Sequence, residues 1–535
     1  MSREQIIGLN QIAQNLIDRP SYDKVFASNP SCMTATDNRG STNDRGLAIL
    51  LALAAAVLVV HLLTGGRYGF HRDELATLDD ARHLAWGYVA YPPVTPFFGW
   101  LSLKLFGTSL TGFRFFAALA TSVAVVLTGL MAREMGGKTF ARTLAASAAI
   151  PFALAAGSLM QYVSFDYLAW VGCSYFFVLL CKSRDPRWWL AIGVCIGLGM
   201  LTKYSMLVCA LAIAAGVLFT DLRIHLRTKW LWFGVAASLL IFLPNLIWQI
   251  QNHFISLDFL RHIHERDVRI GRTKDFLPDQ LKLTLFTLPL AILGLCFYFG
   301  SKMGRPFRAV GCLYVIPLFI FMIAKGRGYY LAPAYPVLYA GGAFFAAELI
   351  AKLRPVWQIS LRWLAWASVV TTITLAAMYF VPLAPMDSLW ARQVLKVNDD
   401  FREEIGWPDL VQKVAQIRDS LGPEERAQFG ILAGNYGEAG AINLYGKEHG
   451  LPEPICGTNS FWARGYGDPP PETLIVIGFS REFGERYFES CKMVGRITNQ
   501  HDVANEESTD HPDILLCRHL RERWPEFWKK FRRYG

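Results

Sequence analysis

Long apolar stretches recur through the middle of the chain and alternate with short polar connections. Most of them contain about 16–22 residues, the length that a helix needs to cross a bilayer. The pattern predicts eleven spans, at 46–64, 111–132, 141–158, 164–181, 188–201, 204–220, 230–248, 283–300, 309–324, 330–351 and 363–383. Segment 92–107 is also apolar, but its Pro cluster and its central Lys104 favour a helix that lies at the membrane interface.

A different pattern begins after residue 384. Short apolar runs flanked by helical stretches predict a small α/β domain over 385–535 with a parallel sheet. Its expected strands are 428–433, 473–479 and 492–498. Its expected helices are 409–420, a helix that follows the turn Asn435-Tyr436-Gly437 and ends near Tyr445, and 481–489. Residues 1–45 show no periodicity and are rich in Ser, Asn, Asp and Thr, so we expect a disordered tail. The predicted fold class is therefore mainly α, a polytopic membrane module over 46–384 followed by an α/β domain.

The charges predict how the chain is oriented in the membrane. Alternate short connections between spans each carry three basic residues: Arg133, Lys138 and Arg142; Lys182, Arg184 and Arg187; Arg223, Arg227 and Lys229; Lys302, Arg305 and Arg308; Lys352, Arg354 and Arg362. Basic connections stay in the cytoplasm. We therefore expect an inner (plasma) membrane protein with a cytoplasmic N-terminus. Loops 65–110 and 249–282 and the domain 385–535 would lie on the periplasmic or extracellular side.

Composition excludes two classes of function. Residues 46–384 are only about 13% charged, which is far too apolar for a soluble enzyme. The excess of Lys and Arg lies between spans and not on one patch, which argues against nucleic-acid binding. Of the cysteines expected outside, Cys456, Cys491 and Cys517, two could form one disulfide. The sequence contains no CxxC or Cys/His spacing typical of a structural zinc site.

Acidic residues of the membrane module concentrate on the predicted outer side. Nine of fourteen fall in the two large outer loops. Asp73 and Glu74 begin a helical stretch in the first loop, where they are either an ordinary N-terminal capping pair or part of a site. Asp166 alone sits at the outer mouth of a span, and ionisable groups at membrane depth indicate function.

Cations are expected at the same outer depth. Lys203 lies between two spans, either as a ligand or as a side chain that snorkels to the headgroups. The segment Lys325-Gly-Arg327-Gly-Tyr-Tyr330 suits a phosphate, although it could also be an interfacial anchor. Carboxylates beside cations above an apolar bundle fit a sugar linked to a lipid phosphate. One carboxylate would take a proton from an acceptor hydroxyl while cations stabilise the leaving phosphate.

The run GFHRDELATLDDARHLAWGYVAYPPVTPFFGWLSLKLFG (69–107) resembles the first-loop signature of the protein O-mannosyltransferase and aminoarabinose-transferase superfamily. Weaker matches follow in the expected order: SFDYLAW (164–170), GLGMLTKYS (197–205), PNLIWQIQNHFISLDFL (244–260), KGRGYYLAPAYPVLYAGGA (325–343), NYGEAGAINLYG (435–446) and NSFWARGYGDPP (459–470). These proteins are membrane glycosyltransferases of the GT-C fold. The resemblance implies transfer of a sugar from a polyprenyl-phosphate donor to an acceptor hydroxyl, with inversion and with no covalent intermediate.

The resemblance also implies roles for particular residues. Asp73 takes the position of the catalytic base, and Glu74 would be its neighbour in the site. Asp166 matches an Asp that tends to occur at the outer end of a later span in the family. Lys203, Lys325, Arg327 and Tyr330 lie where contacts to the donor phosphate are expected. Some relatives carry a basic residue where this chain has Ala76 and Thr77, and Arg72, immediately before the acidic pair, is the candidate substitute. Tyr91, His253 and Arg261 are candidates for contacts to the acceptor or within the outer loops.

Two other classes of function stay open from the residues. A secondary transporter or lipid flippase would use similar spans, although we find no internal repeat. A structural or receptor protein would use the domain 385–535 as its binding module. We expect no required cofactor or metal ligand set, although a divalent metal near paired carboxylates is an alternative. The acceptor is left open between a protein hydroxyl, lipid A, a glycan and another lipid.

Overall fold

The computed structural model describes residues 36–535, and the prediction of a disordered tail over 1–35 lies outside the described residues. Residues Ile49–Gly535 form one compact unit. Every predicted span is helical. The helices from the first span to the last are α2 (Thr36–Thr64), α3 (Arg72–Arg82), α4 (Val94–Phe106), α5 (Leu110–Glu134), α6 (Thr139–Ala156), α7 (Tyr162–Ser183), α8 (Trp188–Met200), α9 (Met206–Leu218), η3 (Asp221–Arg227), α10 (Lys229–Gln251), α11 (Ile255–Arg269), α12 (Phe276–Thr284), α13 (Leu288–Leu295), α14 (Arg308–Ile323), η7 (Gly328–Ala334), α15 (Tyr335–Ala351) and α16 (Pro355–Phe380).

Nine helical stretches in the described part of the chain are long and apolar enough to cross a membrane, and a tenth results if α9 and η3 count as one span bent by 104°. The expected eleventh, α8, has 13 residues and is shorter than a full span. Gly193 of α8 and Gly234 of α10 let their backbones approach closely, because a Cβ built on Gly193 would lie 2.0 Å from the Gly234 carbonyl oxygen. The expected interfacial segment 92–107 is a separate short helix, α4.

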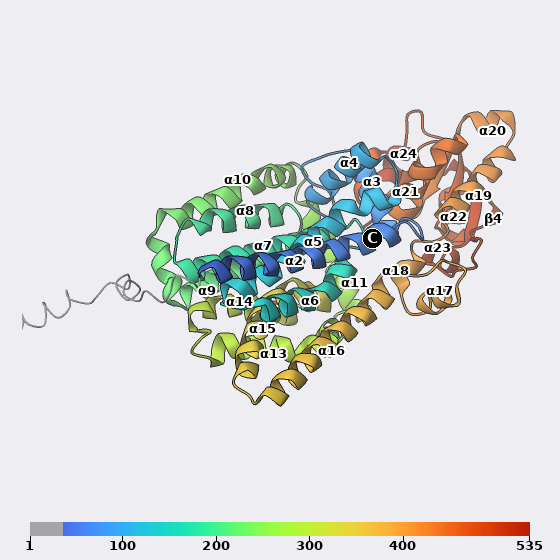
Figure 1. Ribbon diagram of the computed structural model, residues 1–535. Coiled ribbons are helices and arrows are strands. Elements are labelled where there is room, and N and C mark those ends of the chain that lie inside the picture. Colours follow the sequence, from blue (N-terminus) through green and yellow to red (C-terminus); the bar gives the residue numbers. More distant parts are fainter. Residues whose placement is uncertain (1–35) are drawn as a thin grey trace, which may run out of the picture. The chain divides into compact units, whose positions relative to one another are not determined.

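Helices α5, α6, α7 and α15 form the interior of the bundle (Figure 1). In each of these helices, between 61% and 72% of the most apolar 18-residue stretch is buried inside the protein. In α10 and α16 the buried share is 17%. The outer helices remain strongly apolar although they are exposed in the protein. Lipid tails would cover these faces, so the chain is a multi-pass membrane protein.

The C-terminal domain contains one sheet of five strands in the order β2-β1-β3-β5-β4. Its strands are β1 (Phe429–Ala433), β2 (Ile455–Cys456), β3 (Thr473–Ile477), β4 (Phe488–Arg496) and β5 (Asp513–Leu520). Its helices are α17 (Leu389–Val394), α18 (Asp399–Arg402), α19 (Trp407–Asp419), α20 (Pro423–Ala427), α21 (Tyr436–Tyr445), α22 (Arg481–Tyr487), α23 (Glu506–Thr509) and α24 (Trp524–Lys530). The fold class predicted from the sequence is confirmed.

The sheet is parallel only in part. Strand β1 runs parallel to β3, as expected, and also to β2, a short strand that the sequence analysis did not predict. Strand β5 runs antiparallel to both β3 and β4. The sequence analysis missed β5, because its short apolar core Ile514–Cys517 runs directly into a basic segment. Cys491 of β4 and Cys517 of β5 form a disulfide, and Cys456 is a buried free thiol. The expected single disulfide is therefore confirmed.

The C-terminal domain packs directly against the first loop of the membrane module. Helix α21 lies on α3, and the contact is close enough that a Cβ on Gly440 would lie 2.7 Å from the Leu75 Cβ. Leu75, Leu78 and Phe113 share one hydrophobic core with Trp407 and Val411 of the C-terminal domain. Both parts consequently belong to the unit Ile49–Gly535. The domain boundary near residue 385 stays a prediction, and it coincides with the change from long helices to α/β structure.

Candidate active site

Helix α3 begins with two interlocking caps that hold its first turn. The Nδ1 atom of His71 accepts a hydrogen bond from the backbone N–H of Asp73 at 3.1 Å. In return, the Glu74 carboxylate accepts a hydrogen bond from the backbone N–H of His71 at 2.9 Å. This reciprocal pattern is a capping box, which fixes where a helix starts. It leaves the Asp73 side chain free to point away from the helix.

Asp73 faces a cavity of about 950 Å³. The cavity is lined by residues from α3, the turn after it, the start of α7, the α8–α9 connection, α11, the α14–η7 connection and the C-terminal domain. These include Arg72, Asp73, Asp80, Tyr91, Gln161, Tyr162, Lys203, Arg266, Arg272, Arg327, Tyr330, Asp400, Glu403, Asn435, Tyr436, Ser460, Glu506, Asp510 and Arg533. The sequence analysis expected Asp73, Lys203 and Arg327 on the same side of the membrane module, and all three line this one cavity.

Asp73 is held by two hydrogen bonds and remains accessible. The Tyr436 hydroxyl donates to its Oδ1 at 2.7 Å, and the Gln161 side-chain amide donates to its Oδ2 at 3.0 Å. Its side chain is 44% exposed. These donors orient a carboxylate whose remaining lone pairs face the cavity. Tyr436 lies 363 positions further along the chain, and the sequence analysis missed it.

Lys203 is surrounded by aromatic rings. Its ammonium lies 4.3 Å from the centre of the Tyr330 ring, 5.1 Å from Tyr162 and 5.2 Å from Tyr329. No carboxylate oxygen lies within 4.0 Å of it among the described residues. Ring faces attract a cation without neutralising it. Lys203 therefore presents a cation on the cavity wall that is not tied up in an ion pair.

Three arginines add positive charge on the wall formed by the second loop and η7. Arg327 donates two hydrogen bonds to Asp267, at 2.5 and 3.0 Å, so its charge is largely compensated. Arg266 lies 3.7 Å from the same carboxylate, and its Nε has no hydrogen-bond partner among the described residues. Arg272 is exposed on the cavity wall. The sequence analysis did not select Arg266 or Arg272.

Arg72 also lines the cavity, but its guanidinium is already paired with nearby acids. Its guanidinium pairs with Glu506 and lies 3.7 Å from Glu403. It also stacks over the Tyr436 ring at 5.1 Å. Burial, together with Glu507, raises the pKa of Glu403 to about 7 despite this guanidinium. Arg72 therefore connects α3 to the C-terminal domain more than it offers a free charge to a ligand.

Glu74 and Asp166 lie outside the cavity. Glu74 is fully buried and forms a bidentate pair with Arg114, at 2.9 and 2.6 Å. Glu404 approaches the same guanidinium at 3.3 Å. Asp166 is buried within α7, and its Oδ1 has no hydrogen-bond partner among the described residues. The ion pair with Arg114 makes Glu74 an anchor for α3, and neither acid lines the cavity.

The other candidates from the sequence separate into two groups. Tyr91 and Tyr330 line the cavity, and Tyr91 donates a hydrogen bond to Asp80 at 2.9 Å. Lys325, His253 and Arg261 are exposed and do not line it. Arg261 pairs instead with Glu265 at 2.9 Å, on the face of α11 that points away from the cavity.

A second ion-pair cluster joins α3 to the C-terminal domain. Arg464 lies 2.8 Å from Asp79 and 3.1 Å from Asp80. Burial favours the neutral form of Asp79, but hydrogen bonds from His83 and Arg464 outweigh burial and lower its pKa. Burial dominates for Asp80 and raises its pKa to about 7. Asp79 and Asp80 share the Arg464 guanidinium, so the anionic form is strongly favoured only for Asp79.

The described residues contain no cluster of three or more His, Cys, Asp or Glu side chains that could hold a metal ion. Independence from a metal stays a prediction.

Comparison with known proteins supports the fold and the resemblance. The sequence profile of the dolichyl-phosphate-mannose-protein mannosyltransferase family matches residues 90–248. An undecaprenyl phosphate-α-4-amino-4-deoxy-L-arabinose arabinosyl transferase of Pseudomonas fluorescens is 27% identical over 245 residues, which cover 42% of each chain. A lipopolysaccharide core galacturonosyltransferase of Rhizobium johnstonii is 27% identical over 226 residues, 41% of this chain and 44% of that one. The matched region thus spans less than half the length of these relatives.

Structural similarity extends over most of the chain. The crystal structure of ArnT from Cupriavidus metallidurans bound to undecaprenyl phosphate superposes with a TM-score of 0.55 at 16% identity, over 88% of this chain and 97% of that one. Its apo state gives a TM-score of 0.57 over 89% and 98%. The GT-C fold and the resemblance to this superfamily, both expected from the first-loop run, are confirmed.

Proposed function

From a chain with the GT-C fold and relatives that transfer sugars, we propose a membrane glycosyltransferase that uses a polyprenyl-phosphate-linked sugar as donor. One observation carries the proposal: an accessible carboxylate, Asp73, and a cation without an ion-pair partner among the described residues, Lys203, line one cavity of about 950 Å³. The acceptor would be a hydroxyl of a lipid, glycan or protein. The cavity would open on the non-cytoplasmic side of the inner membrane, with the N-terminus in the cytoplasm.

The donor phosphate would bind where positive charge is available. Lys203 has no carboxylate partner among the described residues, whereas Arg327 and Arg72 are already paired. We therefore assign the phosphate to Lys203 first, supported by Arg266 and Arg272, which line the same cavity. The hydroxyl of Tyr330, whose ring contacts the same ammonium, is a second candidate ligand. Positive charge held ready at this point stabilises the phosphate as it leaves.

Asp73 would act as the general base. It would take the proton of the acceptor hydroxyl while the oxygen attacks the anomeric carbon. The bond between that carbon and the phosphate oxygen breaks, and its electron pair leaves with the polyprenyl phosphate. Attack from the face opposite the phosphate inverts the anomeric centre. Tyr436 and Gln161 would hold the carboxylate in the orientation this requires. Independence from a metal belongs to this proposal, so EDTA should leave transfer unchanged.

The test compares Asp73→Asn with the unmodified protein, both purified in nanodiscs and given a panel of radiolabelled polyprenyl-phosphate sugars. Loss of a general base lowers the rate by about 10²–10⁴-fold, so we expect transfer to fall by at least about 10²-fold. Asp258→Asn is the matched control, since Asp258 is an exposed outer-loop acid that does not line the cavity. Transfer by Asp73→Asn at the rate of the control would remove Asp73 from this role. Movement of intact donor across the bilayer without cleavage would instead indicate a flippase.

A further inference from the structure

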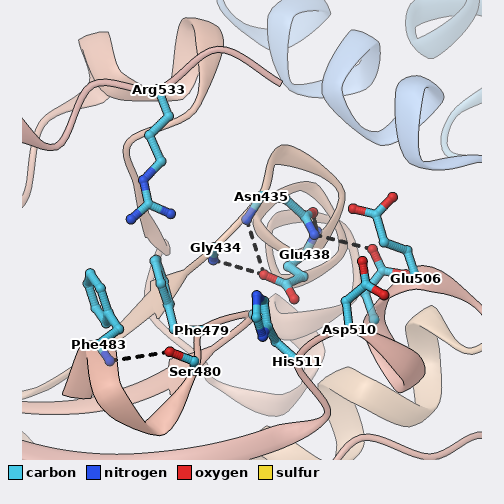
Figure 2. Close-up of a pocket in the computed structure, with 12 residues that line it drawn as sticks. Gly434, Asn435, Glu438, Phe479, Ser480, Phe483, Glu506, Asp510, His511 and Arg533 are labelled. Carbon is cyan, nitrogen blue, oxygen red and sulfur yellow. Dashed lines mark hydrogen bonds between the residues drawn. The ribbon is translucent and has the colours of Figure 1, made fainter. Parts of the chain in front are cut away.

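A second, smaller cavity lies wholly within the C-terminal domain. Its volume is about 420 Å³, and it sits where two neighbouring parallel strands end, because Gly434 follows β1 and Gly478 follows β3 (Figure 2). Ligands of α/β sheets bind in the crevice beyond the carboxyl ends of the strands. A Cβ on Gly478 would lie 2.3 Å from the Glu438 carboxylate, and its φ of +70° also favours glycine. We call this cavity the sheet-edge crevice.

Two buried carboxylates line the crevice, and each has an oxygen without a donor. Glu438 is fully buried, and its Oε2 accepts hydrogen bonds from the backbone N–H groups of Gly434 and Asn435, at 2.8 and 3.2 Å. Glu507 is also buried, and its Oε1 accepts from the Asn435 side chain at 3.2 Å. The second oxygen of each acid has no hydrogen-bond partner among the described residues. Buried acceptors of this kind are costly unless a donor completes them.

The walls of the crevice differ in character (Figure 2). Glu506 and Asp510 lie on one side, and His511 lies near Glu438 between the walls. On the other side, the rings of Phe479 and Phe483 stack at 4.1 Å, and Arg533 lies over both. Glu506 is paired with Arg72, which leaves Glu438, Glu507 and Asp510 opposite the Arg533 guanidinium and the His511 imidazole. The acids still outnumber the cations, so the crevice disfavours an anionic ligand. The two phenyl rings offer an apolar surface beside the acids.

The crevice continues into the cavity that holds Asp73. Gly434, Asn435, Glu506, Asp510 and Arg533 line both spaces. The connecting element is the first turn of α21, where Tyr436 donates its hydrogen bond to Asp73 and Glu438 lies two residues further on. A ligand seated in the crevice would thus reach towards the proposed base.

We propose that the sheet-edge crevice is the acceptor subsite and that it takes an amino sugar; this rests on the proposed function. An ammonium group supplies three hydrogen-bond donors and a positive charge for the incompletely bonded oxygens of Glu438 and Glu507. The sugar hydroxyls donate to Asp510 and Glu506. The apolar face of the sugar ring packs on Phe479 and Phe483. A hydroxyl at the other end of the sugar then extends towards Asp73.

Binding is tested first, without donor, by saturation-transfer NMR on the full chain in nanodiscs. The probes are glucosamine, N-acetylglucosamine, which lacks the charge, and glucuronic acid, which reverses it. We expect glucosamine to bind best, and Glu507→Gln and Asp510→Asn each to weaken it by about tenfold, which is about 1.4 kcal/mol. Asp510 is exposed, so its substitution leaves folding intact. Glu453→Gln, at an exposed acid elsewhere in the domain, is the matched control. Equal binding of the three sugars, or unchanged affinity in both crevice variants, would overturn the proposal.

Transfer assays separate this proposal from the proposed function. Asp73→Asn should bind glucosamine normally while losing transfer, because Asp73 lies outside the crevice lining. If the unmodified protein binds glucosamine but cleaves no donor, the proposed transferase function fails and the amino-sugar site stands. If transfer proceeds and the crevice variants show an unchanged KM for the acceptor, the acceptor subsite fails and the transferase function stands.

Discussion

Replacing Arg114 with methionine tests whether α3 is held from within the membrane module. Arg114 belongs to α5, and all of its polar contacts are to the first loop or to the C-terminal domain. It donates to Glu74 at 2.9 and 2.6 Å and to the carbonyl oxygens of Gly65 and Gly69 at 2.8 and 3.0 Å. Methionine fills a similar volume but supplies none of these donors.

The expected cost follows from what the substitution leaves behind. Glu74 is fully buried, and in Arg114→Met it would keep only the backbone N–H groups of His71 and Met160. Breaking a buried pair by removing one partner costs about 3–5 kcal/mol. Glu404 contributes less to the stability of this ion-pair cluster. Burial raises its pKa to about 7, so near neutral pH part of it is protonated and carries no charge. The variant Glu404→Gln should therefore cost less than about 1 kcal/mol.

The assay is thermal unfolding in detergent combined with sugar transfer. We expect Arg114→Met to melt at a clearly lower temperature than Glu404→Gln, and to lose transfer even at temperatures where it remains folded. Arg114→Lys is the matched control, since it keeps the charge but cannot form the bidentate pair, and it should fall between the two. Melting of Arg114→Met at the temperature of the unmodified protein would refute the reasoning. Full transfer by the folded variant would show that the pair does not position Asp73.

Two further predictions concern the C-terminal domain and its contact with α3. The folded protein holds the proton of Asp80 up to about pH 7, whereas the unfolded chain releases it near 3.8, so this group's contribution to stability falls as pH rises between about 4 and 7. Asp80→Asn cannot titrate, and its melting temperature should depend less on pH over that window; equal slopes would contradict the assignment. The disulfide Cys491–Cys517 closes a loop with a sequence separation of 26, and replacing both cysteines with serine should cost about 3 kcal/mol. Limited proteolysis should then cleave the domain faster than in Cys296→Ser, which removes an exposed free thiol; equal rates would argue against this.

The spans and the position of Asp73 could be predicted because each depends on local pattern. Hydrophobic length identifies the spans, and the caps of α3 lie within a few residues of one another. The roles of adjacent acids could not be predicted in the same way. Asp73 and Glu74 differ by one position, about 100° around a helix, and this sends one to the cavity and the other to Arg114. A signal was present, because Arg114 lies within a predicted span, and a cation there requires an acid partner.

The cations of the second loop show a related limit. Arg261 and Arg266 both belong to α11, but only Arg266 lines the cavity. Which face of α11 turns inwards depends on packing against segments far away in the chain, and charge alone carries no such information. The same holds for Arg464 and Tyr436, which reach α3 from more than 300 positions away. Asn435 and Glu438 form a capping box at the start of α21, a local pattern, whereas the contact from Tyr436 to Asp73 required the structure.

The proposed base is therefore positioned from two directions. Arg114 anchors Glu74 from α5, and the next residue back, Asp73, receives the Tyr436 hydroxyl from α21. Because the same first turn of α3 bears both contacts, a shift of either the bundle or the C-terminal domain moves the Asp73 carboxylate. Arg464 and Arg72 add two ion-pair connections along the same helix. The C-terminal domain thus forms a wall of the cavity and helps to orient the Asp73 carboxylate. This role accounts for its contacts with α3 from Arg72 to Arg82.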